Sequence, residues 1–257
     1  MIEMRRFFLE NKPVNLNEGD IVPIDGELYN HIFNSLRHES GDRILLLDGD
    51  GLKYEVEVLE VGQETAECRI ESIGATTGEP QIQIFIAQSI AKKDNFEYVL
   101  QKSTEIGAAG FYPLETARTV VKIKESKKKK KLNRWEKIIE EAARQSERGE
   151  IPEIYEPVGL EKLRESFPEF DAVLIARARD EVRGLKEVIS KLETNSDYED
   201  LRILLLVGPE GGFTDSEIKK VLSADNAYGF NLGPRILRTE TVAPLVTGLI
   251  LYEKGEI

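Results

Sequence analysis

The sequence of 257 residues predicts an α/β protein, in which a small, mostly β domain is followed by a larger domain with a largely parallel sheet. Two observations predict this class. Apolar and charged residues alternate from Leu52 to Val58, which is the period of a half-buried strand. Later, the continuous apolar runs 172–176 and 203–207 alternate with segments of helical spacing, as expected for parallel strands that are buried on both faces.

The small domain is expected to span residues 1–74. Its apolar run Ile44–Leu47 leads into Asp48–Gly51, whose Asp and Gly residues favour a hairpin turn before the alternating strand. The small and polar segment Ala75–Pro80 is a plausible linker to the second domain, which we expect to span residues 75–257.

In the second domain, strands are expected at 82–87, 111–114, 172–176, 203–207 and 227–232. Helices are expected from residue 96, around 135–143, after residue 214 and up to about residue 252. The segment Thr194–Asp200 is expected to be a loop.

Three helix starts carry capping signals. Asp94 with Glu97, and Thr214 with Glu217, have the spacing of a capping box, and Asn133 is a candidate cap for the helix around 135–143.

The net charge of −12 argues against a nucleic-acid partner, but its distribution weakens that argument. The stretch Arg118–Arg148 carries a charge of +7 and the remainder −19, and the local patch decides whether an anion binds. Within this stretch, Lys127–Lys131 favours a solvated mobile loop over an RNA contact, although such a run adds salt-dependent affinity for RNA.

The sequence has no second cysteine and no long apolar run, and both features bear on the expected cellular compartment. The single cysteine, Cys68, indicates a reducing compartment, and no apolar run reaches the roughly 18 residues of a membrane span. His31 and His38 have no partners at metal-ligand spacing, so we expect no metal site. A cytoplasmic protein without membrane association is expected.

Two glycine-bearing turns are candidates for a ligand site. The segment Leu206–Phe213 joins a buried strand to a helix, and its three glycines allow a ligand to approach the backbone closely. The segment Asn231–Thr241 is a second such turn, at the carboxyl end of a strand expected to neighbour the first, where open α/β sheets bind ligands. No Gly-Lys-Ser/Thr follows the first turn, which excludes a phosphate loop, and its glycine spacing excludes a dinucleotide fingerprint, so an oxidoreductase is disfavoured. A mononucleotide-like ligand stays open. Thr239 or Thr241 alone would be explained as a cap of the last helix, and Pro244 requires that this helix start just before it.

These two turns, Gly208–Gly212 and Leu232–Thr241, resemble those of the SPOUT methyltransferases. Within that superfamily the chain is similar to the ribosomal RNA small subunit methyltransferase E family, which methylates N3 of one uridine in small-subunit (16S) rRNA. The likeness continues along the chain in weaker segments that follow the family's order: Arg5–Phe8, His31–Arg37, Gln101–Gly107, Arg134–Trp135 and Ala142–Arg148. Val242 and Ile106 depart from the family's usual alanine and leucine.

The resemblance implies a PUA-like RNA-binding β-barrel in residues 1–74 and a trefoil-knotted SPOUT domain in residues 75–257. It implies a homodimer with the active site at the interface, and a partner that is small-subunit rRNA or the assembled small ribosomal subunit. It implies S-adenosylmethionine as cofactor, bound by Leu206, Val207, Gly208, Gly211, Leu232, Gly233, Ile236, Leu237 and Arg238. The basic residues expected to contact RNA, together with one amide, are Arg5, Arg6, Arg37, Arg118, Arg144, Gln145 and Arg148; Lys53 is a further candidate.

Methylation at N3 of uracil requires that the N3 proton leave, so a carboxylate base or donors to the uracil anion are expected nearby. Glu210 and Glu240 lie in the two turns and are the candidates, with Arg238 and Arg235 to orient cofactor or substrate. Glu240 is equally well explained by the dipole at the start of its helix, and Glu210 by bracing of its turn. The alternatives are a SPOUT enzyme for another RNA site or a ribose 2′-oxygen, and a non-catalytic ribosome-assembly factor.

Overall fold

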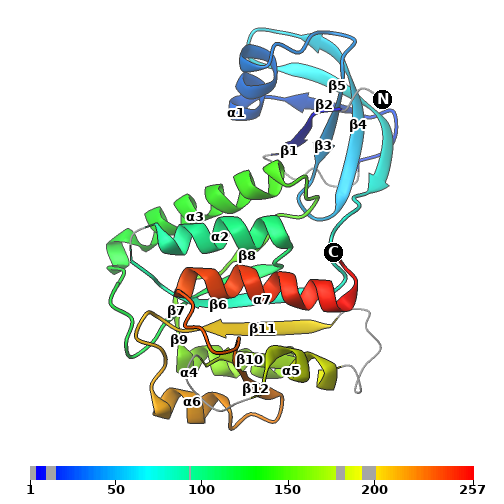
Figure 1. The fold of residues 1–257 in the computed structure, drawn as a ribbon. Coiled ribbons are helices and arrows are strands. Elements are labelled where there is room, and N and C mark those ends of the chain that lie inside the picture. The colour runs from blue at the N-terminus through cyan, green and yellow to red at the C-terminus, as the bar shows by residue number, and fades with distance from the viewer. Residues whose placement is uncertain (1–3, 10–15, 93, 178–182, 193–200) are drawn as a thin grey trace. The chain divides into compact units, whose positions relative to one another are not determined.

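The computed structural model describes residues 4–9, 16–92, 94–177, 183–192 and 201–257 (Figure 1). Two compact units are present. The first comprises 1–79 together with 143–151, and the second comprises 80–142 together with 152–257. No pattern in the sequence indicates that 143–151 joins the first unit. Because Thr194–Asp200 lies outside the described residues, the loop expected there stays a prediction.

The first unit is a five-stranded sheet in the order β1-β3-β4-β5-β2. Its elements are β1 (Arg6–Phe8), β2 (Ile21–Ile24), α1 (Gly26–Tyr29), the π-helical turn η1 (Asn30–Ser35), β3 (Arg43–Leu47), β4 (Leu52–Val61) and β5 (Ala66–Ala75). The expected hairpin joins β3 to β4, where the Asp48 carboxylate accepts the N–H groups of Asp50 and Leu52 at 2.8 and 3.0 Å. The alternating face of β4 packs into the core, although Leu52 itself is exposed.

The second unit contains a seven-stranded parallel sheet. Its strand order is β12-β10-β11-β6-β7-β8, and β9 also pairs with β7. The strands are β6 (Gln83–Ser89), β7 (Gly110–Glu115), β8 (Glu153–Ile154), β9 (Val158–Gly159), β10 (Ala172–Ala176), β11 (Arg202–Val207) and β12 (Ala227–Phe230). The central strands β10 and β11 are almost wholly buried, as their apolar runs predict.

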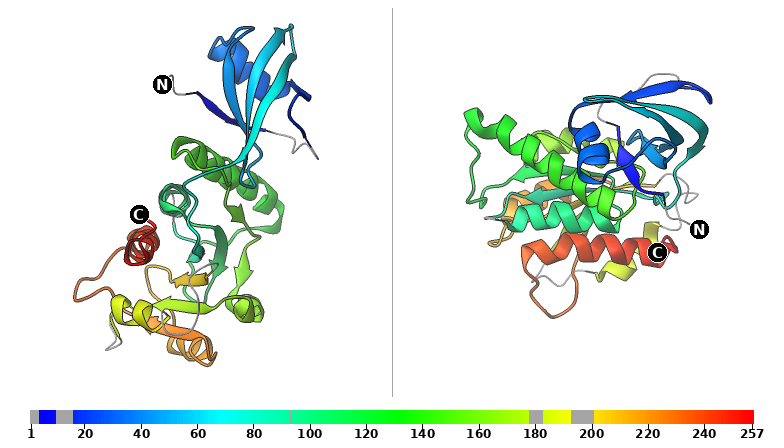
Figure 2. Two further views of the ribbon diagram at one scale, coloured as in Figure 1. Left: turned by 90° about the vertical axis from the view of Figure 1, so that its right-hand side faces the viewer. Right: turned by 90° about the horizontal axis from the view of Figure 1, so that it is seen from above.

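Helices cover both faces of this sheet (Figure 2). They are α2 (Asn95–Ile106), α3 (Glu125–Gln145), α4 (Leu160–Leu163), the 3₁₀ turn η2 (Arg164–Glu169), α5 (Leu185–Leu192), α6 (Asp215–Val221) and α7 (Thr239–Lys254). α7 packs against α2 and contacts β6 and β11. Residues of α4, η2 and α6 form a core with the other face of β10 and β11.

The lysine run does not form the loop that the sequence favoured. α3 begins at Glu125, so Lys127–Lys131 is helical and Asn133 lies inside the helix, where it cannot act as a cap. Lysine has a straight side chain and is a good helix former, and an i,i+3 ion pair between Lys128 and Glu125, 2.6 Å apart, supports the first turn.

The two expected capping boxes have opposite outcomes. Thr214 and Glu217 form both reciprocal hydrogen bonds of the box at the start of α6. Asp94 stands at the N-cap of α2 but makes no side-chain capping bond, because its backbone is helical and Glu97 pairs with Arg134 at 2.6 Å instead.

Candidate functional site

Both glycine turns lie at the edge of the sheet where the strands end. The turn 208–213 follows β11 and the segment 231–238 follows β12. The expectation that these two strands are neighbours is wrong, because β10 lies between them in the sheet. The turns therefore flank the carboxyl end of β10, and together with Ala176 and Arg177 they line a cavity of about 780 Å³.

Thr239 ties the two turns together. Its hydroxyl donates to the carbonyl of Gly208 at 2.6 Å and accepts from the amide nitrogen of Gln88, at the end of β6, at 2.9 Å. Neither threonine of the segment caps α7: the N-cap is Arg238, which makes no side-chain capping bond. The expectation that the helix starts just before Pro244 is wrong, because α7 begins at Thr239 and Pro244 lies in its second turn. Pro244 has no N–H to donate to the carbonyl of Glu240.

The glycine-rich turn is closely packed on one side and open on the other. A Cβ at Gly208 would approach the Phe213 ring to 3.1 Å, which is tight contact, and Gly212 and Gly233 have the positive φ values of 69° and 84° that favour glycine. Arg118 donates to the carbonyls of Gly211 and Phe213 at 2.7 and 3.3 Å. Arg118 therefore shapes the cavity wall.

A buried carboxylate joins this turn to the segment after β7. Glu217 accepts the backbone N–H groups of Thr214 and Ala117 at 2.7 and 2.8 Å. Burial raises the pKa of Glu217, but these hydrogen bonds outweigh it, so the pKa lies below the ordinary value for glutamate.

The candidate carboxylates both line the cavity. The Glu240 side chain is 16% exposed in the first turn of α7, and its carboxylate lies 3.8 Å from the guanidinium of Arg238, which is 86% exposed. Glu210 is exposed in the glycine-rich turn. A carboxylate and a cation thus line one cavity, which suits the binding of a polar ligand and the removal of a proton from it.

Most residues expected to bind the cofactor line this cavity: Val207, Gly208, Gly211, Leu232, Gly233, Ile236, Leu237 and Arg238. Leu206 does not, because it is fully buried in the sheet. Further residues that the sequence did not predict for the site also line the cavity, among them Asn95, Ala176, Arg177, Phe230, Thr239 and Val242. Ala176 and Phe230 end β10 and β12, so the rule that ligands bind at strand ends would have found them.

The residues expected to contact RNA do not all lie in the same unit. Arg118 lines the cavity in the second unit, and the others lie in the first unit. Arg5, Arg37 and Gln145 are exposed there, whereas Arg6 pairs with Glu147 at 3.2 Å and Arg144 lies 3.4 Å from His31.

Arg148 is a correction to the expected RNA contacts. It is 8% exposed, and Glu79 accepts two hydrogen bonds from its guanidinium, at 2.7 and 3.1 Å. The same carboxylate also accepts the N–H groups of Gly149 and Glu150. Arg148 therefore holds 143–151 in the first unit and is not available to a phosphate.

Within the described ranges, no group of three His, Cys, Asp or Glu side chains is placed to hold a metal ion. Nor does any helix there have the length and apolar character needed to cross a lipid bilayer.

Comparison with known families and sequences matches both units. The RNA methyltransferase domain family matches residues 78–251, and the RNA methyltransferase PUA domain family matches residues 24–71. The chain is 34% identical, over 97% of its length and 97% of the relative, to the ribosomal RNA small subunit methyltransferase E of Bacillus subtilis.

Two solved structures resemble the whole chain. A ribosomal RNA small subunit methyltransferase E from Neisseria gonorrhoeae, bound to S-adenosylmethionine, is 28% identical with a TM-score of 0.82, and 98% of each chain is covered. A methyltransferase from Legionella pneumophila, also with the cofactor bound, is 30% identical with a TM-score of 0.81, again over 98% of each chain. These likenesses confirm the expected fold class, a SPOUT-type domain joined to a PUA-like domain.

Replacing Thr239 by Val keeps the shape of the side chain but leaves the Gly208 carbonyl and the Gln88 amide without their partner. We expect the free energy of unfolding to fall by about 1–3 kcal/mol, measured by denaturant titration. Thr241→Val, at an exposed position of the same helix turn, is the control and should change it little. Equal effects of the two substitutions would contradict the role of Thr239.

Replacing Glu217 by Gln should lower the free energy of unfolding by about 1–2 kcal/mol at neutral pH. Because the pKa of Glu217 is lowered in the folded state, its contribution is complete above the unfolded-state pKa and is lost as the pH falls through the folded-state pKa. The difference between wild type and variant should therefore shrink in acid. Glu165→Gln, at an exposed carboxylate, should show no such trend; a pH-independent difference for Glu217→Gln would be the contrary result.

Proposed function

The chain belongs to the ribosomal RNA small subunit methyltransferase E family, and on that premise we propose that it methylates N3 of one uridine in small-subunit rRNA, with S-adenosylmethionine as methyl donor. The observation that carries this proposal is the cavity of about 780 Å³ that both glycine turns line at the ends of β10, β11 and β12. Its volume lies in the range of roughly 300–1,000 Å³ that small-molecule sites occupy.

The residues present fit this cofactor. Leu232, Ile236 and Leu237 supply apolar walls for an adenine ring, and Ile236 is 63% exposed in the cavity, as expected of a side chain that a ligand covers. The glycines at 208 and 211 leave the backbone open to close approach. When bound, S-adenosylmethionine supplies a methyl group activated by a sulfonium centre.

For the substrate, we assign the proton transfer to Glu240. Its carboxylate lines the cavity and is mostly shielded from solvent, whereas Glu210 is exposed. A carboxylate within hydrogen-bond reach of N3 takes the proton that blocks its lone pair. Arg238, exposed and 3.8 Å from Glu240, is placed to stabilise the uracil anion or to bind the adjacent phosphate.

Methylation is tested by offering the protein S-adenosylmethionine with small-subunit rRNA, and with assembled small subunits that lack the modification. Nucleoside mass spectrometry of the product should detect 3-methyluridine at one site. A ribose-methylated nucleoside would contradict the proposal, as would cofactor binding without any methylated product from either substrate.

Glu240→Gln should lower kcat by roughly 100- to 10,000-fold, the usual contribution of a general base, while the Kd for the cofactor changes little. Glu210→Gln is the matched variant in the other turn and should reduce kcat far less. The cofactor Kd is measured by calorimetry and kcat with saturating RNA. If Glu240→Gln weakens cofactor binding as much as turnover, Glu240 is structural.

We further propose that the active form is a homodimer that uses the outer face of α7. Tyr98, Leu245, Leu249 and Ile257 are large apolar side chains that are 39–64% exposed, and they line one shallow depression with Glu240. Apolar side chains gathered on one face mark an interaction surface. Since Glu240 also lines the cavity, a second copy seated on this face would border the site, as the family resemblance implies.

Leu249→Glu should convert the dimer to a monomer, because it places a charge in the centre of the proposed interface, and it should reduce methyl transfer. Ile21→Glu, at an exposed apolar residue of β2, is the control and should leave the mass unchanged. Sedimentation equilibrium measures the mass. A wild-type monomer, or a dimer that survives Leu249→Glu, would contradict this assignment.

A further inference from the structure

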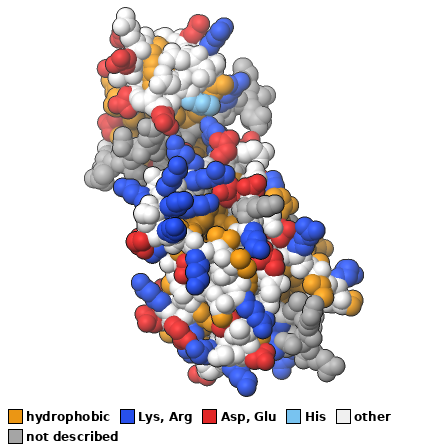
Figure 3. All heavy atoms as spheres, turned by 90° about the vertical axis from the view of Figure 1, so that its left-hand side faces the viewer, with side chains coloured by type: hydrophobic (Ala, Val, Ile, Leu, Met, Phe, Trp, Pro, Cys, Tyr) orange, Lys and Arg blue, Asp and Glu red, His pale blue; other side chains and the backbone are white. Residues whose placement is uncertain are grey.

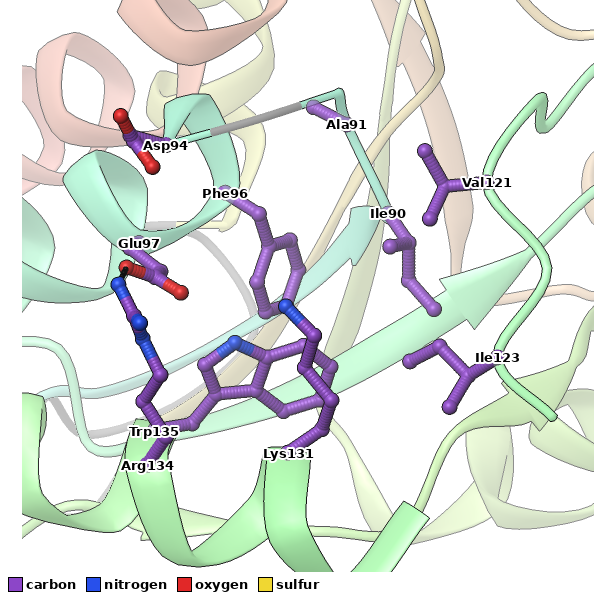
Figure 4. Close-up of a pocket in the computed structure, with 10 residues that line it drawn as sticks. All are labelled: Ile90, Ala91, Asp94, Phe96, Glu97, Val121, Ile123, Lys131, Arg134 and Trp135. Carbon is purple, nitrogen blue, oxygen red and sulfur yellow. Dashed lines mark hydrogen bonds and ion pairs between the residues drawn. The ribbon is translucent and has the colours of Figure 1, made fainter. Parts of the chain in front are cut away.

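A second, smaller pocket lies in the same unit, between α2, α3 and the segment 116–124. It measures about 180 Å³ and is lined by Ile90, Ala91, Asp94, Phe96, Glu97, Val121, Ile123, Lys131, Arg134 and Trp135 (Figure 4). Its volume is below the roughly 300 Å³ at which drug-sized ligand sites begin, so it suits a single ring system.

The floor of the pocket is aromatic and apolar. The rings of Phe96 and Trp135 lie 4.7 Å apart between centroids, and each residue is only 2% exposed. The Trp135 nitrogen is on the ring edge that faces Glu97 in Figure 4. An indole N–H can only donate, so this edge offers a hydrogen-bond donor to a ligand that enters the pocket.

Charged side chains of both signs line the pocket: Lys131 and Arg134 are cations, and Asp94 and Glu97 are carboxylates. The Lys131 ammonium is 6.0 Å from the centroid of the Trp135 ring, and Arg134 is held in place by its 2.6 Å ion pair with Glu97. The exposed lysines of Lys127–Lys131 continue along the same helix. From the side where the strands of the large sheet end, Figure 3 shows Lys and Arg side chains gathered around hydrophobic surface. The phosphate groups of a single-stranded RNA outside the pocket would meet these cations, and a base inside the pocket would meet the aromatic rings.

The pocket adjoins the cofactor cavity. At the start of α2, Asn95 lines the cavity and the next residue, Phe96, lines the pocket. In the segment after β7, Arg118 lines the cavity and Val121 lines the pocket. A strand that enters the cavity with one nucleotide therefore passes the pocket with a neighbouring one.

We propose that this pocket binds one unpaired nucleobase of the RNA substrate, next to the nucleotide that enters the cofactor cavity. The base inserts against Phe96 and Trp135, a ring carbonyl or ring nitrogen accepts the indole N–H, and Lys131 contacts the attached phosphate. This inference rests on the proposed function only in taking RNA as the substrate.

Trp135 is the only tryptophan of the chain, so its fluorescence reports on this pocket alone. Without cofactor, the full chain is titrated with hexauridylate and with an abasic hexamer that carries the same phosphates. Hexauridylate should change the emission saturably and bind at least tenfold more tightly than the abasic hexamer, as base stacking predicts. Equal affinities, or RNA binding detected by anisotropy without a change in emission, would overturn the proposal.

Variants separate base insertion from general charge. Val121→Phe fills the pocket from a half-buried position and should bring the two affinities to within about twofold of each other, while cofactor binding by calorimetry stays unchanged. Lys131→Met should weaken the binding of hexauridylate. Lys130→Met, one residue away and outside the pocket, should weaken the binding of both oligomers equally and leave the ratio of the two affinities unchanged. An unchanged ratio in Val121→Phe would show that no base enters. If the wild-type protein does not bind S-adenosylmethionine, the proposed function is wrong. The RNA affinities still test the base pocket in that case, because they are measured without cofactor.

Discussion

The hydroxyl group of Thr239 is the contact on which the geometry of the proposed cofactor cavity depends. It connects the Gly208 carbonyl, after β11, to the Gln88 side chain, at the end of β6, and it does so from the first residue of α7. A hydroxyl group can donate and accept at the same time, which lets one side chain hold both partners. The two glycine turns follow strands that do not touch, so without this link the sheet alone would not fix their distance.

Two further contacts between residues far apart in the sequence hold segments around the cavity. Arg118 donates to the carbonyl of Gly211 in the glycine-rich turn, and Glu217, in the helix after that turn, accepts the backbone N–H of Ala117. Both contacts involve the segment after β7, whose later residues line the smaller aromatic pocket. The position of this segment therefore influences the cofactor cavity and the proposed base pocket together.

Local patterns in the sequence predicted much of this arrangement. The apolar runs of β10 and β11, the turn chemistry at Asp48 and the capping box at Thr214 act over a few residues, and all are present in the structure. The glycine turns predicted a ligand site at the place where the structure has its cavity of about 780 Å³. Side-chain partners distant in sequence were beyond reach: Thr239 bonds across 151 residues to Gln88, and Arg148 across 69 to Glu79. The run Lys127–Lys131 is helical and not a loop, because the helix propensity of lysine outweighs the tendency of a charged run to stay solvated.

Amide hydrogen exchange with and without S-adenosylmethionine tests most directly whether the two turns form one cofactor site. We expect the cofactor to protect 208–213 and 232–238 at the same ligand concentration, because the cavity is lined by both and Thr239 holds them together. Amides of β4 and β5, in the first unit, should exchange as before. Protection of only one turn, or of neither at saturating cofactor, would contradict a single shared site.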